Sequence, residues 1–126
     1  MVFITHMEHH SSHTSWYETN ADVVIIDPDI NLQVSTENLR KKLNEYKDRL
    51  FKIGSFTACS NVTGIRTPYY EMAQIMHEYG GVVFIDFAAS APYDKMDMHP
   101  ADPKQNSMPS CFRPTNFLVV RVLPAY

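Results

Sequence analysis

The chain has little cysteine, no excess of basic residues and no long apolar run, and each scarcity excludes a class of protein. Two cysteines, Cys59 and Cys111, are too few for a disulfide framework and favour a reducing cytoplasm. A formal net charge of -3 gives no basic surface, so we expect no nucleic-acid partner. No apolar run approaches the roughly 20 residues that span a bilayer, and no basic segment precedes an apolar one as in a secretion signal. We therefore expect a cytoplasmic protein that does not bind or span a membrane.

Apolar segments alternate with amphipathic ones along most of the 126 residues, which suit one small domain. Strands are expected at residues 1–5, 21–28, 50–58 and 82–86, because these segments are rich in β-branched and aromatic residues. Helices are expected near Ser12, after residue 35 and after residue 67. This alternation predicts an α/β fold of three layers with a mostly parallel sheet.

The two longer helices have recognisable ends and apolar faces. Thr36 is a good N-cap for the first, and Leu39, Leu43, Tyr46 and Leu50 would share one face of it. In the second, Thr67 is the expected N-cap and Pro68 the first helical residue. Its expected buried face and its terminating glycine pair are Tyr69, Met72, Ile75, Met76, Tyr79 and Gly80-Gly81.

The segment with most bearing on function is the apolar run at 82–85, which leads directly into Asp86. A continuous apolar run of this kind predicts a strand buried on both faces of a parallel sheet. Open α/β sheets bind ligands at the carboxyl ends of their strands, where Asp86 would lie. The alternative is that Asp86 only caps the following turn.

Three blocks in order resemble one known family. They are Glu8-His9-His10-Ser11 ahead of Trp16, the turn Ser-Asn-Val-Thr-Gly at 60–64, and Val-Phe-Ile-Asp at 83–86 followed by Ser-Ala-Pro at 90–92. Together they resemble the class V aminotransferases, pyridoxal 5'-phosphate enzymes of the cysteine desulfurase and selenocysteine lyase type. The resemblance covers about residues 2–103 and implies the large domain of a fold type I enzyme that acts on an amino-acid substrate.

The resemblance also assigns roles to individual residues. It implies that His9 stacks on the pyridine ring of the cofactor and that Asp86 pairs with the pyridine nitrogen. A carboxylate there keeps that nitrogen protonated, so the ring can accept electrons from a substrate carbanion. Asn61 is implied to lie near the phenolic oxygen and the substrate.

Two departures from the family pattern bear on activity. Ala89 stands where the family usually has a glutamine that bonds the phenolic oxygen. The lysine that forms the Schiff base is absent, because neither Lys95 nor Lys104 lies in a Ser/Thr-x-His-Lys or Ser-Pro-His-Lys context. We therefore expect an inactive chain with no catalytic residue of its own and weak or no cofactor binding.

Residues 104–126 do not resemble the family and are expected to be poorly organised, with one short apolar run at 117–122 that could form an edge strand. From residue 106 onward, the codons that these amino acids allow are compatible in another frame with Leu-Asp-Ala-Ile-x-Phe-Ser-Pro-His-Lys-Phe-Leu-Gly-Gly-Pro-Gly-Thr-Pro-Gly. That peptide looks like the missing lysine segment. A frameshift near Gln105, natural or from sequencing, would explain the tail, and codons incompatible with it in the gene would exclude the idea.

The family also carries a phosphate-binding segment before the Glu-His block and a small domain at its carboxyl end. The resemblance therefore implies that residues 1–103 are the central part of a large domain, cut at both ends. Uncovered strand edges on such a piece favour a homo-oligomer or other self-association. Among family reactions, cleavage of the C–S bond of cysteine comes first, and other class V aminotransferase or lyase chemistry second.

Two readings outside the family stay open. His6, His9, His10 and His13 crowd eight residues, and His9 and His13 could share a helix face as metal ligands. The chain could also be a non-enzymatic interaction protein that assembles through its sheet. Cys59, near the expected end of a strand, is expected to be a small buried residue.

Overall fold

The structure, a computed structural model, describes residues 1–93. In chain order its elements are β1 (Val2–Thr5), α1 (His10–Tyr17), β2 (Val23–Ile26), α2 (Thr36–Glu45), β3 (Ile53–Thr57), α3 (Tyr69–Glu78) and β4 (Val82–Asp86). The expectations for Lys95, Lys104, Cys111 and the 104–126 tail lie outside the described residues.

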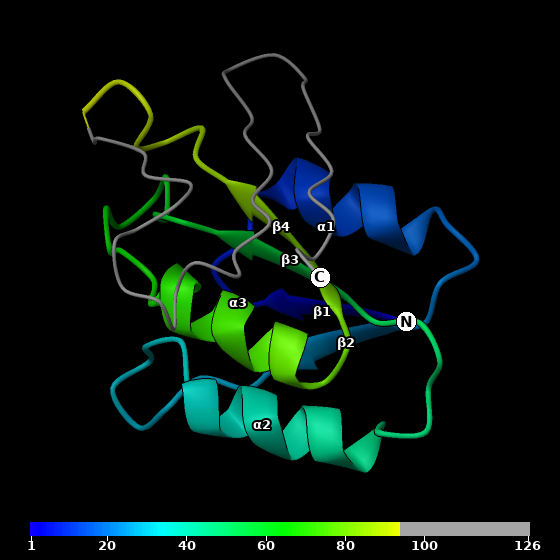
Figure 1. The fold of residues 1–126 in the computed structure, drawn as a ribbon. Coiled ribbons are helices and arrows are strands. Elements are labelled where there is room, and N and C mark those ends of the chain that lie inside the picture. Colours follow the sequence, from blue (N-terminus) through cyan, green and yellow to red (C-terminus); the bar gives the residue numbers. More distant parts are fainter. Residues whose placement is uncertain (94–126) are drawn as a thin grey trace.

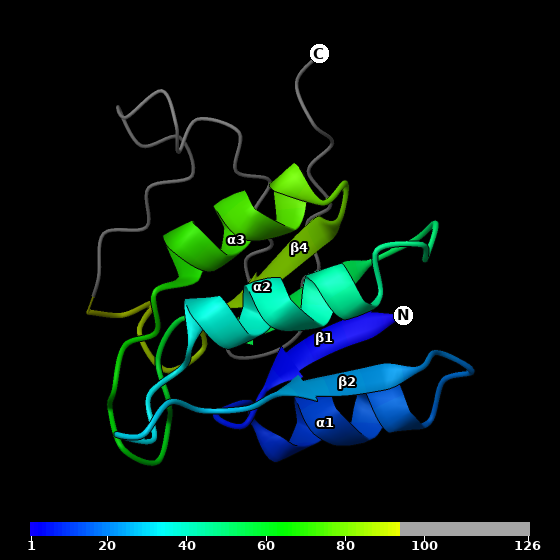
Figure 2. The ribbon, with the colours of Figure 1, turned by 90° about the horizontal axis from the view of Figure 1, so that it is seen from below.

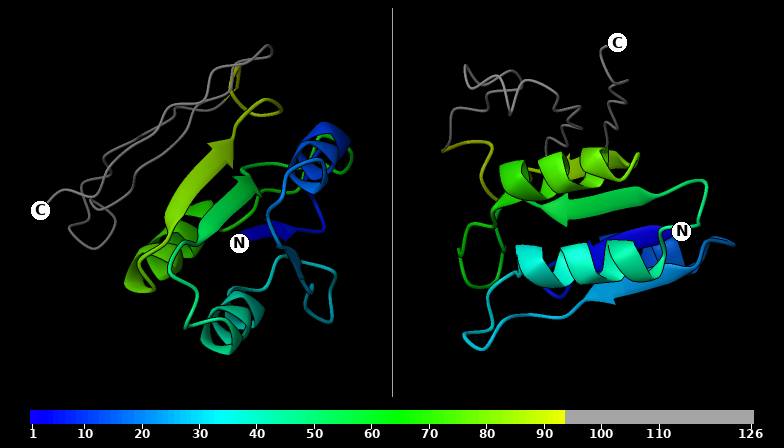
Figure 3. Two further views of the ribbon diagram at one scale, coloured as in Figure 1. Left: turned by 90° about the vertical axis from the view of Figure 1, so that its right-hand side faces the viewer. Right: turned by 60° about the horizontal axis from the view of Figure 1, so that its bottom comes forward.

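The four strands form one sheet in the order β2-β1-β3-β4, and every neighbouring pair is parallel (Figure 1). Helix α1 lies against one face, and α2 and α3 lie against the other (Figures 2 and 3). The predicted three-layer α/β architecture is thus confirmed. In such a sheet, ligands bind where neighbouring strands send their connections to opposite faces, and β1 and β3 do so here.

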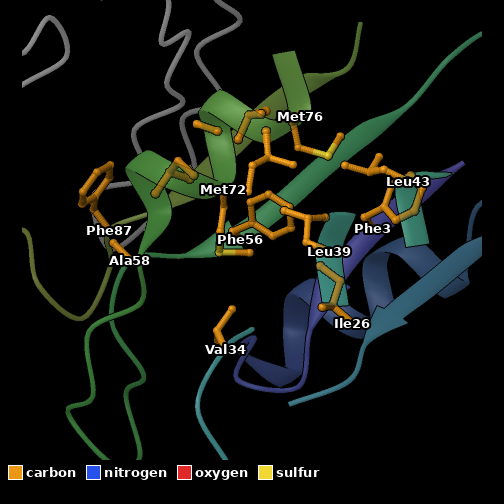
Figure 4. Packing of buried hydrophobic residues seen from close by; sticks show 14 residues of the cluster. Phe3, Ile26, Val34, Leu39, Leu43, Phe56, Ala58, Met72, Met76 and Phe87 are labelled. Carbon is orange, nitrogen blue, oxygen red and sulfur yellow. The ribbon is translucent and has the colours of Figure 1, made fainter. Parts of the chain in front are cut away.

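The core lies between the sheet and the pair α2 and α3 (Figure 4). Phe56 of β3 is fully buried there, with Phe3 of β1 on the same side of the sheet. The two helices contribute Leu39, Leu43, Met72 and Met76, all fully buried. The predicted apolar faces are therefore confirmed at these four positions.

Helix α2 is shorter than the apolar spacing predicted. It ends at Glu45, and Leu50 is fully exposed instead of continuing the buried face. A ten-residue helix extends about 15 Å, close to the length of the strands it covers. The chain therefore turns back at Tyr46, and β3 begins only at Ile53.

Both predicted N-caps are also wrong by one residue. Ser35 caps α2, since its side chain accepts a hydrogen bond from the Asn38 N–H at 3.1 Å. Pro68 occupies the N-cap position of α3, whereas the Thr67 hydroxyl donates to the Thr57 carbonyl at 2.5 Å. The glycine pair does end α3, with Gly80 at a φ of +70°.

Strand β4 is buried on one face only, which corrects the expectation of a strand covered on both sides. Val83 and Ile85 face the core, whereas Val82 and Phe84 are half-buried on the α1 side. Helix α1 has no buried residue and so covers that face thinly. Trp16 of α1 approaches Phe84, with ring centroids 6.5 Å apart.

Candidate functional site

A cavity of about 170 Å³ opens at the carboxyl ends of the strands. Three segments supply its walls: the β1–α1 junction, the turn after β3 and the loop after β4. The residues lining it are His9, Thr57, Cys59, Asn61, Asp86, Ala88 and Ala89. All four positions singled out in the sequence, at 9, 61, 86 and 89, are therefore brought together.

Asp86 ends β4 opposite Thr57 of β3 in the ladder. One carboxylate oxygen accepts a hydrogen bond from the Ala88 N–H at 2.9 Å. The carboxylate thus caps the following turn, as one reading of the sequence held, and it also lines the cavity. Asp86 can therefore be both a turn cap and a ligand-binding residue, because the hydrogen bond from the Ala88 N–H holds the carboxylate in place.

His9 is the N-cap of α1. Its ring Nδ1 accepts a hydrogen bond from the Ser11 N–H at 3.2 Å and lies 2.8 Å from the Ser11 hydroxyl. The ring is exposed, and these two contacts limit its rotation at the mouth of the cavity.

Asn61 is presented by a closed turn between β3 and α3. Cys59 and Arg66 form an antiparallel bridge at its base. Within it, the Ser60 N–H donates to the Ile65 carbonyl at 2.9 Å, and Gly64 takes a φ of +71°. This local bonding, which includes the predicted glycine, brings Asn61 back beside the strand end.

Cys59 lines the cavity and is half-buried, so the expectation of a small buried residue is wrong. Its thiol is free, and its Sγ lies 3.7 Å from the Ser60 carbonyl. The residue follows a strand end by two positions, where the backbone leaves the sheet and uncovers the side chain.

Glu8 is a functional candidate that the sequence analysis did not assign. Its Oε1 accepts hydrogen bonds from the Thr5 hydroxyl at 2.7 Å and from the Thr57 N–H at 3.0 Å. Removal from water raises the pKa of this carboxyl from 4.5 to about 7. Hydrogen bonds from Thr5 and Thr57 oppose this rise in pKa, and the negative charge of Asp86 adds to it.

The histidine cluster does not form a metal site. His6 bonds the Leu32 carbonyl at 3.1 Å and His13 bonds the Thr5 carbonyl at 3.2 Å, which directs the two rings to different parts of the backbone. Within residues 1–93, no group of three or more His, Cys, Asp or Glu side chains could hold a metal ion. The metal reading is therefore not supported here.

No lysine of the described part of the chain lines the cavity. Lys52 is buried and lies before β3 at the amino end of the sheet. Its ammonium donates to the carbonyls of Lys47, Arg49 and Tyr79 at 3.1, 2.7 and 3.4 Å. This amine is therefore at the wrong edge of the sheet to reach a ligand beside Asp86.

Comparison with known proteins places the site in context. A family model described as aminotransferase class-V matches residues 1–102. A probable cysteine desulfurase of Halalkalibacterium halodurans is 32% identical over 101 residues, which are 77% of this chain and 24% of that protein. A cysteine desulfurase of Synechococcus elongatus is 34% identical over 105 residues, which are 80% of this chain and 16% of that protein. This chain thus spans about a quarter or less of the length of these relatives.

Solved structures agree on the fold. A NifS-like protein from Rickettsia africae superimposes with a TM-score of 0.72 at 16% identity, over 88% of this chain and 29% of that one. Serine palmitoyltransferase from S. paucimobilis, solved with bound PLP and myriocin, gives a TM-score of 0.59 at 22% identity, over 68% and 20% of the two chains. Within residues 1–93, no helix has the length and apolarity to cross a membrane.

Proposed function

Because this chain belongs to the class-V aminotransferase family, we propose that its cavity is the ring-binding part of a pyridoxal 5'-phosphate site. The supporting observation is that His9, Asn61 and Asp86 come from three separate segments and line one cavity. We assign stacking on the pyridine ring to His9, pairing with the pyridine nitrogen to Asp86, and contact with the phenolic oxygen to Asn61.

The residues present fit the ring of this cofactor. An imidazole, a carboxamide and a carboxylate match an aromatic face, a phenolic oxygen and a protonated ring nitrogen. The cavity of about 170 Å³ is smaller than the roughly 300–1,000 Å³ of complete ligand pockets. No lysine or arginine is among its described lining residues. It therefore suits the ring rather than the phosphate group.

When bound, this cofactor withdraws electrons from the α-carbon of an amino acid. The chain's contribution is to hold a proton on the ring nitrogen through Asp86, whose carboxylate is oriented by the Ala88 N–H. His9 restricts the tilt of the ring, because its own orientation is set by Ser11. Ala89 has no side-chain donor, so Asn61 is the neutral polar donor assigned to the phenolic oxygen.

We further propose that residues 1–103 are the central part of a large domain and are inactive alone, since no lysine among residues 1–93 lines the cavity. For the intact parent we favour cleavage of the C–S bond of cysteine, because the relatives above are named as desulfurases. Other class V chemistry on an amino-acid substrate is the alternative. A frameshift origin for residues 104–126, and a cytoplasmic location, remain predictions.

The test uses pyridoxine 5'-phosphate, whose alcohol cannot form a Schiff base and so does not label surface lysines. Calorimetric titration of the full chain should show weak saturable binding. Asp86→Asn should weaken it by about 10- to 100-fold, the effect of losing a charged hydrogen bond. Unphosphorylated pyridoxine should bind about as well as the phosphate.

Asp27→Asn is the matched control, because Asp27 also follows a strand end but does not line the cavity. It should leave the affinity unchanged. No saturable binding by the unsubstituted chain, or equal losses in the two variants, would contradict the proposal. Borohydride reduction after adding pyridoxal 5'-phosphate should give adducts at several lysines. One dominant lysine adduct would contradict the proposal that the chain lacks a Schiff-base lysine.

Self-association is a second proposal, supported by the edge strand β2. Among the described residues β2 pairs only with β1, and Ile25 is 41% exposed on it. An uncovered apolar edge favours pairing with a second chain. Light scattering should show oligomers that dissociate in Ile25→Lys, and a monomer at all concentrations would exclude the idea.

A further inference from the structure

The two strands that meet at the cavity do not end together. The β1–β3 ladder runs only from the Val2–Ile53 pair to the Ile4–Ser55 pair. On its other side, β3 continues pairing with β4 as far as Thr57 and Asp86. The last part of β3 therefore has a strand on one side only, within the described part of the chain.

Beyond the end of the β1–β3 ladder, the side chain of Glu8 replaces β1 as the hydrogen-bond partner of β3. The Thr57 N–H donates to Glu8 Oε1 at 3.0 Å, while the next N–H along the chain, that of Ala58 just after β3, donates to the Asp86 carbonyl at 2.8 Å. The same Oε1 accepts the Thr5 hydroxyl at 2.7 Å, which ties it to the end of β1. One carboxyl oxygen thus joins the end of β1 to the end of β3, although Glu8 and Thr57 are 49 residues apart in the chain.

This junction bears directly on the cavity. Glu8 immediately precedes His9, and Thr57 pairs with Asp86 in the ladder and itself lines the cavity. A change in the distance from β1 to β3 would therefore move His9 relative to Asp86. Glu8 is thus connected to both walls of the cavity. It is next to His9 in the chain, and its carboxyl group is hydrogen-bonded to Thr57.

We propose that Glu8 is a positioning residue, which sets the distance between His9 and Asp86 by bonding the end of β1 to the end of β3. The inference rests on the proposed function for its consequence, which is ring binding, but the contact itself can be tested without a ligand. The acceptor oxygen is the essential part, so a glutamine should replace the glutamate and an alanine should not.

The test compares Glu8→Ala and Glu8→Gln with Glu18→Ala, a control at the exposed end of α1. In the unliganded protein, amide exchange of Thr57 should be at least about fivefold faster in Glu8→Ala than in Glu8→Gln, since a hydrogen bond is worth about 1 kcal/mol. The His9 ring resonances should shift in Glu8→Ala alone. Affinity for pyridoxine 5'-phosphate should fall about tenfold in Glu8→Ala and less than threefold in Glu8→Gln.

Where Glu8→Ala does not fold, Thr5→Val replaces it, because valine keeps the shape of Thr5 and removes the hydroxyl that bonds Glu8. It should accelerate Thr57 exchange to a smaller degree. Unchanged Thr57 exchange in both variants would overturn the proposal, as would an equal loss of affinity in Glu8→Gln and Glu8→Ala. No binding by the unsubstituted protein would overturn the proposed function instead, and the exchange data would then decide on the contact.

Discussion

The two faces of the sheet differ in how they are covered. Under α2 and α3 the strands present Phe3, Phe56 and Ile85, which are nearly or fully buried in one apolar cluster. Under α1 the helix buries none of its own residues completely, and Phe84 stays half-buried. Val2 and Ile4 of β1 are also fully buried on the α1 side, but the large apolar cluster lies on the other face. The comparison teaches that most apolar packing is on the α2 and α3 face, whereas the ligand-facing residues belong to the strand ends on the α1 side.

The largest expected effect follows from removing a core side chain. Phe56→Ala should lower the free energy of unfolding by about 3–5 kcal/mol, because a large buried side chain is lost and a cavity remains. Trp16→Ala, on the other face, should cost about 1 kcal/mol because the ring is only half-buried. Urea titration followed by circular dichroism measures both, and equal losses would remove the distinction between the faces.

A second prediction concerns the pH dependence of stability at the strand ends. In the unfolded chain Glu8 loses its proton near its ordinary pKa of 4.5, whereas in the folded protein the pKa is about 7. Between these values the folded state holds the extra proton, so stability falls as pH rises from about 4.5 to about 7. The loss due to this group is on the order of 3 kcal/mol.

Glu8→Gln should abolish this part of the pH dependence. The two proteins differ only at this side chain, so the difference between their stability profiles isolates the carboxyl group. Urea unfolding at pH values from 4 to 8 provides the measurement. Parallel profiles would show that Glu8 does not hold its proton in the folded state.

The third prediction compares two neighbours on β3 that face opposite ways. A Cβ added at Gly54 would lie 2.6 Å from the Phe56 ring and 3.1 Å from Met76. Gly54→Ala should therefore cost about 1–3 kcal/mol through overpacking. Ser55→Ala, under α1, should cost about 1 kcal/mol or less, because it removes one buried hydroxyl and adds no atom. Thermal unfolding measures both losses. A larger loss in Ser55→Ala than in Gly54→Ala would show that the tighter packing is on the α1 face.

The smallest effect is expected at the rim of the packed face. Arg40 of α2 and Glu78 of α3 form an ion pair at 2.6 Å, but their side chains are 44% and 41% exposed. Arg40→Met should change the free energy of unfolding by less than about 1 kcal/mol, because exposed pairs are screened by water. A larger loss that disappears at high salt would show that charge, and not apolar contact, joins these helices.

Much of the fold could be predicted because its signals are local. The apolar segments gave four strands, the spacing of Leu39 and Leu43 gave one helix face, and Gly80 gave a helix end. The end of α2 could not be predicted, because Leu50 continues the apolar spacing although the sheet beneath it has already ended. Helix length here is set by the strands that it covers.

The site was predictable only in part, for the same reason. Asp86 follows an apolar strand and Asn61 stands in a glycine-ended turn, so both carry signals in their neighbours. Glu8 stands in the Glu-His block that carries the family resemblance, but no neighbouring residue indicates a positioning role. That role depends on Thr57 and on the unequal ends of two strands. The exposure of Cys59 likewise depends on where the backbone leaves the sheet.

Trp16 gives the chain a built-in optical reporter. It is the one tryptophan among 126 residues, and its indole lies beside Phe84, two positions before Asp86. Its fluorescence emission maximum and lifetime will therefore report on a single location, the contact between α1 and β4. Loosening of that contact should be detectable by fluorescence in unlabelled protein, at concentrations too low for magnetic resonance.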